Sequence, residues 1–149
     1  MLSAGDTMKL ILLIALASII ALADCFAADQ SICNPGTEIS YFPNGAVRSC
    51  LLRDFYPIDG ITCNHLERIT FHGNGKLQSC VSSDEILVGN VPCARYGWIS
   101  FYPSGRLERC TLRVVTEIEG KQCNEQEEVS FLENGKLLSC SSPPGTMPF

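Results

Sequence analysis

The sequence has no apolar run long enough to cross a membrane as a helix. Its apolar run over residues 10–22 has 13 residues, whereas a spanning helix needs about 20. Basic clusters are missing as well, since 11 Lys and Arg stand against 16 Asp and Glu, for a formal net charge of −5. This balance argues against nucleic acid and anionic membranes as partners.

The motifs that carry metal, redox or nucleotide chemistry are also missing. There are two histidines, no C-x-x-C pair and no glycine-rich loop leading from a strand into a helix. Zinc modules, thiol–disulfide catalysts and nucleotide sites depend on such spacings. His65, Glu67 and His72 form the one cluster that suggests acid–base chemistry, but no nucleophile accompanies them. We therefore expect no cofactor, no metal and no enzymatic activity.

The apolar run at residues 10–22 has the length of a signal-peptide core, about 7–15 residues, and Lys9 supplies its positive flank. Two small-residue cleavage motifs follow, Ala21-Leu22-Ala23 and Cys25-Phe26-Ala27. We prefer the second, because it leaves an even eight cysteines, as expected of exported disulfide proteins. Residues 1–27 are thus predicted to be a signal peptide of a secreted or periplasmic protein. The alternative is a lipoprotein anchored through Cys25, the one route to a membrane that the sequence offers.

The rest of the chain consists of four copies of one sequence repeat. The spacing between successive cysteines alternates between 17 and 13 residues, which gives a period of 30 without an insertion. Such a period is typical of repeat proteins. We predict a four-repeat β domain over residues 28–140, with units 33–62, 63–92, 93–122 and 123–140. The segment 141–149 contains three prolines and is expected to be disordered.

Each unit contains one nearly constant stretch, such as Ile39-Ser40-Tyr41-Phe42-Pro43-Asn44-Gly45 in the first. Apolar residues alternate with Ser or Thr, which predicts a strand, and the final glycine predicts a three-residue hairpin loop with a glycine bulge. This register sets Tyr41 opposite Val47, and it predicts one core face made of Ile39, Tyr41, Val47 and their equivalents Ile69, Phe71, Leu77, Ile99, Phe101, Leu107, Val129, Phe131 and Leu137. A second, shorter and more variable turn is expected near residues 58–60, 88–90 and 118–120. No segment has the 3.6-residue apolar period of a helix, so the predicted fold class is all-β.

The pattern aromatic-x-x-Asn-Gly-Lys-Leu at residues 71–77 and 131–137 resembles the MORN-type repeat, and the closest likeness is to cysteine-containing repeat proteins exported by bacteria. The resemblance covers about half of each unit. It implies an elongated single-layer sheet of successive hairpins that serves as a binding or scaffold element. The unit here is longer than a MORN repeat and carries two cysteines that MORN repeats do not need.

The eight cysteines are predicted to form structural disulfides, because a repeat array buries only a thin layer between neighbours. Pairing across 17 residues uses all eight, whereas pairing across 13 residues leaves Cys33 and Cys140 without partners. We prefer the first scheme, although the hairpin register places Cys50 opposite Glu38, five residues from Cys33. A bend at Pro35-Gly36 closes that gap in the first unit, but the second and fourth units lack such a bend. The eight residues concerned are Cys33, Cys50, Cys63, Cys80, Cys93, Cys110, Cys123 and Cys140.

Two sets of outward positions are candidate binding sites. Phe42, His72, Tyr102 and Leu132 form a possible apolar or aromatic strip for an unidentified protein or carbohydrate. Ser40, Thr70, Ser100 and Ser130 could form a hydroxyl row that binds a regular lattice or a glycan, but we interpret them as ordinary solvent-side strand residues. The predicted function is a secreted, non-enzymatic repeat protein that presents a binding surface. The alternative is a self-associating structural component of the cell envelope.

Overall fold

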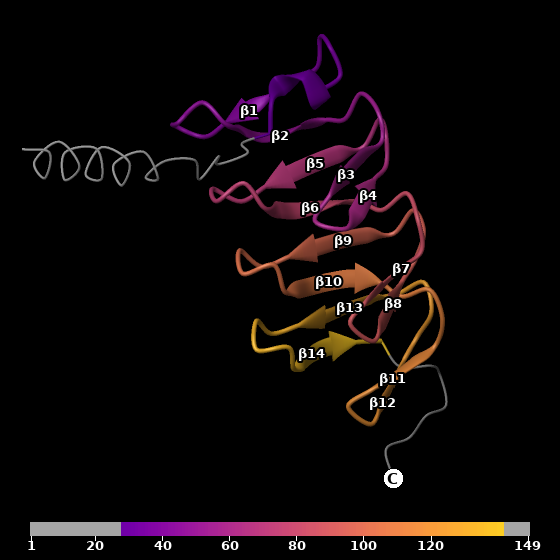
Figure 1. The fold of residues 1–149 in the computed structure, drawn as a ribbon. Coiled ribbons are helices and arrows are strands. Elements are labelled where there is room, and N and C mark those ends of the chain that lie inside the picture. Colours follow the sequence, from indigo (N-terminus) through magenta and orange to yellow (C-terminus); the bar gives the residue numbers. More distant parts are fainter. Residues whose placement is uncertain (1–27, 142–149) are drawn as a thin grey trace, which may run out of the picture.

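The computed structural model describes residues 28–141 and is all-β, with a single turn of 3-10 helix, η1 (Gln30–Ile32), as its only helical segment there. Eight strands form one antiparallel sheet in the order β1-β2-β5-β6-β9-β10-β13-β14. Figure 1 shows these hairpins stacked in sequence order into an elongated array. The strands are β1 (Ser40–Tyr41), β2 (Val47–Leu51), β5 (Arg68–Phe71), β6 (Leu77–Val81), β9 (Trp98–Phe101), β10 (Leu107–Thr111), β13 (Glu128–Phe131) and β14 (Leu137–Cys140).

Three short hairpins lie along one side of this sheet (Figure 1). Each has a two-residue loop, as in the pair Ile58↔Ile61 with Asp59 and Gly60 between them. The predicted second turn is therefore a hairpin in each case, and it is uniform in length rather than variable. The strands are β3 (Tyr56–Ile58) with β4 (Ile61–Cys63), β7 (Ile86–Val88) with β8 (Val91–Cys93), and β11 (Thr116–Ile118) with β12 (Lys121–Cys123).

The core lies between the large sheet and the short hairpins. Ile69, Phe71 and Leu77 are fully buried on one face of the sheet, and the short hairpins pack Tyr56 and Ile58 against them. Asp59 in the first short loop also accepts a hydrogen bond from the backbone N–H of Leu77. The fold thus has two layers, a sheet and a row of short hairpins, where the resemblance to MORN repeats implied one. The second layer is what allows apolar residues on one sheet face to leave water.

The long hairpins have the predicted three-residue loop. Phe42 N–H bonds Ala46 O at 2.8 Å, Gly45 N–H bonds Phe42 O at 2.9 Å, and Gly45 has a φ of 84°. Beyond the loop, however, the pairing shifts by one residue between Tyr41↔Val47 and Ser40↔Ser49. This β-bulge recurs in every repeat. It adds one residue to the returning strand, so it changes which side chains share a face beyond that point.

Because of the bulge, the predicted position of the second cysteine in each unit was wrong by one residue. In the third and fourth units Cys110 pairs with Ile99 and Cys140 with Val129. The uninterrupted register had placed the equivalent cysteine opposite Glu38, one position farther along the strand. The disulfides themselves are the predicted ones across 17 residues, Cys33–Cys50, Cys63–Cys80, Cys93–Cys110 and Cys123–Cys140.

The bend that brings each cysteine pair together is present in all four repeats, contrary to the expectation that the second and fourth units lack it. It has a left-handed residue at its centre: Gly36 in the first unit, and Leu66, Tyr96 and Gln126 in the others, with φ between 58° and 81°. The bend can be predicted from the sequence only in the first unit, where a glycine occupies the left-handed position. Elsewhere, ordinary residues adopt a conformation that costs an L-amino acid free energy.

Replacing Gly36 with Ala is expected to lower the free energy of unfolding by about 1 kcal/mol, because φ is positive there. A Cβ at Gly36 would meet no atom within 4 Å, so the effect is conformational and not steric. Gly73→Ala is the matched control: its φ is ordinary and its nearest neighbour is a ring atom of Phe42 at 3.9 Å. Urea denaturation of both variants measures the difference, and equal stability of the two would contradict the assigned conformation.

Candidate functional site

The sheet face opposite the core carries a continuous row of polar side chains. The residues Ser40, Ser49, Thr70, Ser79, Ser100, Arg109, Ser130 and Ser139 stand directly opposite one another across all eight strands. We call this set the hydroxyl row; seven of its members are Ser or Thr. Adjacent strands of a sheet lie about 4.8 Å apart. The row is therefore a series of polar groups at a regular spacing. Its members differ in exposure: Ser79 and Ser100 near the centre are buried, at 7% and 5%, whereas Ser139 at the end is exposed.

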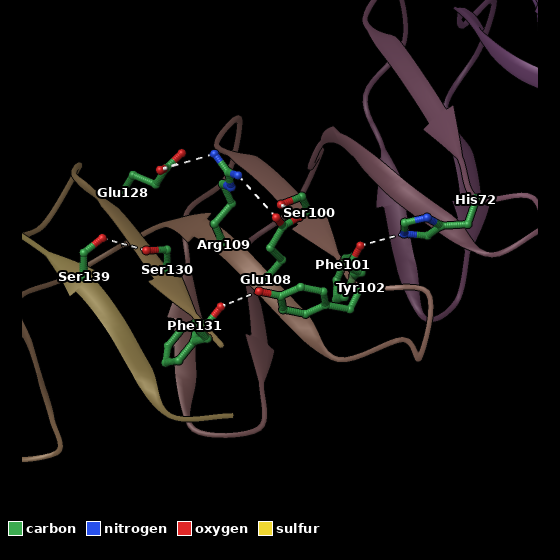
Figure 2. Close-up of polar contacts among 10 residues, drawn as sticks. All are labelled: His72, Ser100, Phe101, Tyr102, Glu108, Arg109, Glu128, Ser130, Phe131 and Ser139. Carbon is green, nitrogen blue, oxygen red and sulfur yellow. Dashed lines mark hydrogen bonds and ion pairs between the residues drawn. The ribbon is translucent and has the colours of Figure 1, made fainter. Parts of the chain in front are cut away.

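The hydroxyls of each hairpin pair with one another. Ser40 Oγ lies 2.8 Å from Ser49 Oγ, Ser130 Oγ lies 2.7 Å from Ser139 Oγ, and Thr70 and Ser79 form the equivalent bond. Figure 2 shows the Ser130–Ser139 pair. A hydroxyl has one donor and two acceptor positions. Each pair therefore uses one donor and one acceptor internally. In the first pair Ser49 Oγ also accepts a bond from Arg68 at 3.5 Å, so that pair keeps one donor and two acceptor positions, and the other two pairs keep one donor and three.

The third hairpin replaces this pairing with a charged network (Figure 2). Ser100 donates to Glu108 Oε2 at 3.1 Å, and the Arg109 guanidinium lies 3.3 Å from the other Glu108 oxygen and 3.8 Å from Glu128. These side chains are partly exposed, so the ion pairs stabilise the fold only slightly. Their effect is to fix the direction of Arg109 at the one position where the row has no hydroxyl.

A second row runs beside the first, two residues away on each strand. Its opposed pairs are Leu51↔Arg68, Val81↔Trp98 and Thr111↔Glu128. Trp98 is the only tryptophan of the chain, and 39% of its surface is exposed. Its side chain lies on the same face as Ser100, because residues two apart on a strand share a face. An aromatic platform thus lies next to the centre of the hydroxyl row.

Sequence reasoning found only half of the hydroxyl row. The four residues considered were Ser40, Thr70, Ser100 and Ser130, whereas Ser49, Ser79 and Ser139 on the returning strands were missed. An uninterrupted register puts Ser49 opposite Ile39, and so on the core face. The signal was present as a Ser-Cys step at residues 49–50, 79–80 and 139–140. Because the cysteine must face the core, its neighbour must face outward.

The structure places three of the four strip residues between neighbouring repeats. His72 Nε2 donates to Phe101 O at 2.7 Å, and Tyr102 OH donates to Phe131 O at 2.9 Å (Figure 2). The Phe42 ring lies beside Gly73 of the next repeat, where an added Cβ would be 3.9 Å from the ring. All three are partly buried. Leu132, at the same position in the last repeat, is 41% exposed, so the strip is mainly a contact between repeats and not an open patch.

The suspected acid–base cluster is not assembled. His65 precedes β5 and contacts the ring of Phe55, whereas His72 follows β5 and bonds the next hairpin. The two histidines therefore lie at opposite ends of one strand. Within residues 28–141, no group of three or more His, Cys, Asp or Glu side chains is arranged to hold a metal ion.

The sequence matches no protein-family model, no curated protein and no solved structure. The resemblance to MORN repeats therefore stays a prediction. The four disulfides are consistent with an oxidising extracellular or periplasmic environment. The predicted signal peptide at residues 1–27, including Cys25, lies outside the described residues, as does the predicted disordered tail from residue 142 on. In the described part of the chain, no helix has the length and apolar character to cross a membrane.

Proposed function

We propose that this is an exported, non-catalytic repeat protein that binds an extended polysaccharide along the outer face of its eight-stranded sheet. The observation that carries the proposal is the hydroxyl row, whose regular spacing across the strands matches a ligand that is itself linear and periodic. A sugar chain offers hydroxyl donors and acceptors along its edge, and these complement the unused positions of the paired Ser and Thr hydroxyls.

Trp98 supports a carbohydrate ligand over a folded protein. Sugar rings have apolar C–H faces that pack on a flat aromatic ring, while their hydroxyls reach polar groups beside it. Tryptophan suits such a mixed surface because it combines a large apolar area with one polar tip. Around it, Arg68 and Arg109 supply exposed hydrogen-bond donors. The predicted signal peptide and the paired cysteines agree with a role outside the cytoplasm.

Trp98 also makes the proposal directly measurable, because it is the chain's only tryptophan. Titration with soluble cello-, chito- and peptidoglycan oligosaccharides is expected to shift or quench its fluorescence for one of these ligands. Trp98→Ala is expected to weaken binding of that ligand by about tenfold or more, as measured by calorimetry, since removing such a contact costs at least about 1.4 kcal/mol.

Leu87→Ala is the matched control. Leu87 is 67% exposed, but it lies on β7 in the layer of short hairpins, so its loss should leave binding unchanged. A fluorescence signal that is flat for every sugar would argue against the proposal, and so would binding that survives in Trp98→Ala. Equal loss of binding in Trp98→Ala and Leu87→Ala would mean that the ligand does not bind specifically at Trp98, which would also argue against the proposal.

A further inference from the structure

Hydrogen bonds join the loop of the second long hairpin to that of the third, and the loop of the third to that of the fourth. From the second loop to the third, Asn74 Nδ2 donates to Pro103 O at 2.9 Å and Lys76 Nζ donates to Ser104 O at 3.2 Å. From the third loop to the fourth, Arg106 donates to Glu133 O at 3.0 Å. The second and third loops thus donate through side chains to backbone carbonyls of the loop that follows. These bonds accompany the strand pairing that holds the repeats together.

The last loop repeats the donor side of this interface. Asn134-Gly135-Lys136 has the same residues as Asn74-Gly75-Lys76. In both loops the asparagine Oδ1 accepts a bond from the lysine backbone N–H, at 3.2 Å in the second loop and 3.0 Å in the fourth. In the second loop this leaves the amide N and the ammonium to reach the next repeat. In the fourth loop the same two donors are exposed and bond no other described residue.

The first loop repeats the acceptor side. Phe42-Pro43-Asn44-Gly45 corresponds to Tyr102-Pro103-Ser104-Gly105, with proline and glycine at the same positions. The carbonyls of Pro43 and Asn44 are therefore equivalent to those that receive Asn74 and Lys76. No preceding loop in the described part of the chain donates to them. The two ends of the array thus carry the two halves of the interface between the second and third repeats.

The strands at these ends are also unpaired on their outer sides. β1 pairs only with β2, and β14 only with β13, among the strands of residues 28–141. Exposed large side chains lie at both ends: Tyr41 at 47% beside the first edge, where its hydroxyl donates to Gln30 Oε1 at 3.2 Å, and Leu132 at 41% and Leu138 at 59% beside the last. One β14 carbonyl, Cys140 O, accepts a bond from Lys121, a flexible exposed side chain that another strand can displace. Open strand edges are templates for pairing with another chain.

From these observations we infer that copies of this protein associate head to tail, with β14 of one copy pairing with β1 of the next. The internal pairs Ser79↔Ser100 and Cys80↔Ile99 define the register of the contact. By equivalence Ser139 lies opposite Ser40, and Cys140 opposite Ile39, of the next copy. The hydroxyl row then continues without interruption from one molecule into the next. The inference does not depend on the ligand of that row.

Sedimentation velocity of the purified oxidised protein over a concentration series tests the inference. The two ends are different surfaces, and such heterologous contacts build open-ended chains instead of closed dimers. The average sedimentation coefficient is therefore expected to rise with concentration without levelling off at a dimer. A strict monomer would overturn the inference, because neither edge would then pair with another copy. A closed dimer would also overturn it.

Lys136→Glu identifies the contact. Replacing the ammonium by a carboxylate facing carbonyl oxygens removes a charged hydrogen bond, and it is expected to weaken association by about tenfold or more. Arg113→Glu makes the same charge change in the middle of the array, beside Glu85, and should leave association unchanged. Circular dichroism and a non-reducing mass confirm that both variants keep the fold and the four bridges. Equal association of the two variants would overturn the proposed interface.

Discussion

Reduction of the four disulfides is expected to unfold the array. Each bridge closes 17 residues of sequence, and in the chain-entropy account a loop of this size contributes about 3 kcal/mol. Four such contributions add up to about 12 kcal/mol, which is comparable to the whole stability of an ordinary domain. A two-layer repeat with a thin core has little else to replace them. Far-UV circular dichroism with and without reductant, together with a free-thiol count, measures this.

Paired serine variants separate the contributions of the bridges. Cys63→Ser with Cys80→Ser removes a bridge whose two residues have no exposed surface, and it interrupts the array at its second repeat. Cys123→Ser with Cys140→Ser removes the last one, where Cys140 is partly exposed. In a repeat protein each unit contacts only its neighbours, so the second variant should fray one end and keep the rest. Native sheet content that persists after full reduction would contradict the assigned role of the disulfides.

Replacing Phe71 with Ala is expected to lower the free energy of unfolding by about 3–5 kcal/mol, because the ring is 2% exposed and its loss leaves a cavity. Tyr41→Ala provides a matched control at the same repeat position. Tyr41 is 47% exposed, because no preceding repeat covers it, and its truncation should cost less than about 1 kcal/mol. Chemical denaturation of both variants gives the comparison. Equal losses would mean that the end of the array is as well packed as its middle.

The contrast between these two residues shows what the repeat pattern could predict and what it could not. The pattern placed Tyr41 in the core stripe together with Phe71, and for Tyr41 this was wrong. A periodic sequence describes an array without ends, whereas burial requires a neighbour on each side. The strip residues differ for the same reason: Phe42, His72 and Tyr102 contact the next repeat, and Leu132 is exposed in the last.

The disulfide scheme followed from the pairing that uses all eight cysteines, the loop type from its glycine, and the all-β fold from the alternation of apolar and polar residues without a helical period. The β-bulge could not be predicted in this way, because the residue type of its extra residue, such as Arg48 or Gln78, does not distinguish it from an ordinary strand residue. That single residue decides whether Ser49 lies on the core face or on the opposite face of the sheet, and hence whether that face carries four aligned hydroxyls or seven. The bend at Leu66 and Gln126 was missed because residues other than glycine adopt its left-handed conformation there.

The alternation of cysteine spacings determines how the chain would carry a pulling force. Every long hairpin lies inside a 17-residue loop closed by a disulfide, while only the 13-residue segments, such as 50–63, lie outside these loops. Tension applied along the chain therefore passes through the sulfur bridges and bypasses each long hairpin, so it acts on the short hairpins and on the strand pairs between repeats, β2–β5, β6–β9 and β10–β13. Each repeat can extend by at most about 45 Å, the contour length of its 13-residue segment. A stretched molecule would lengthen through its short hairpins while the hydroxyl-bearing loops stay closed.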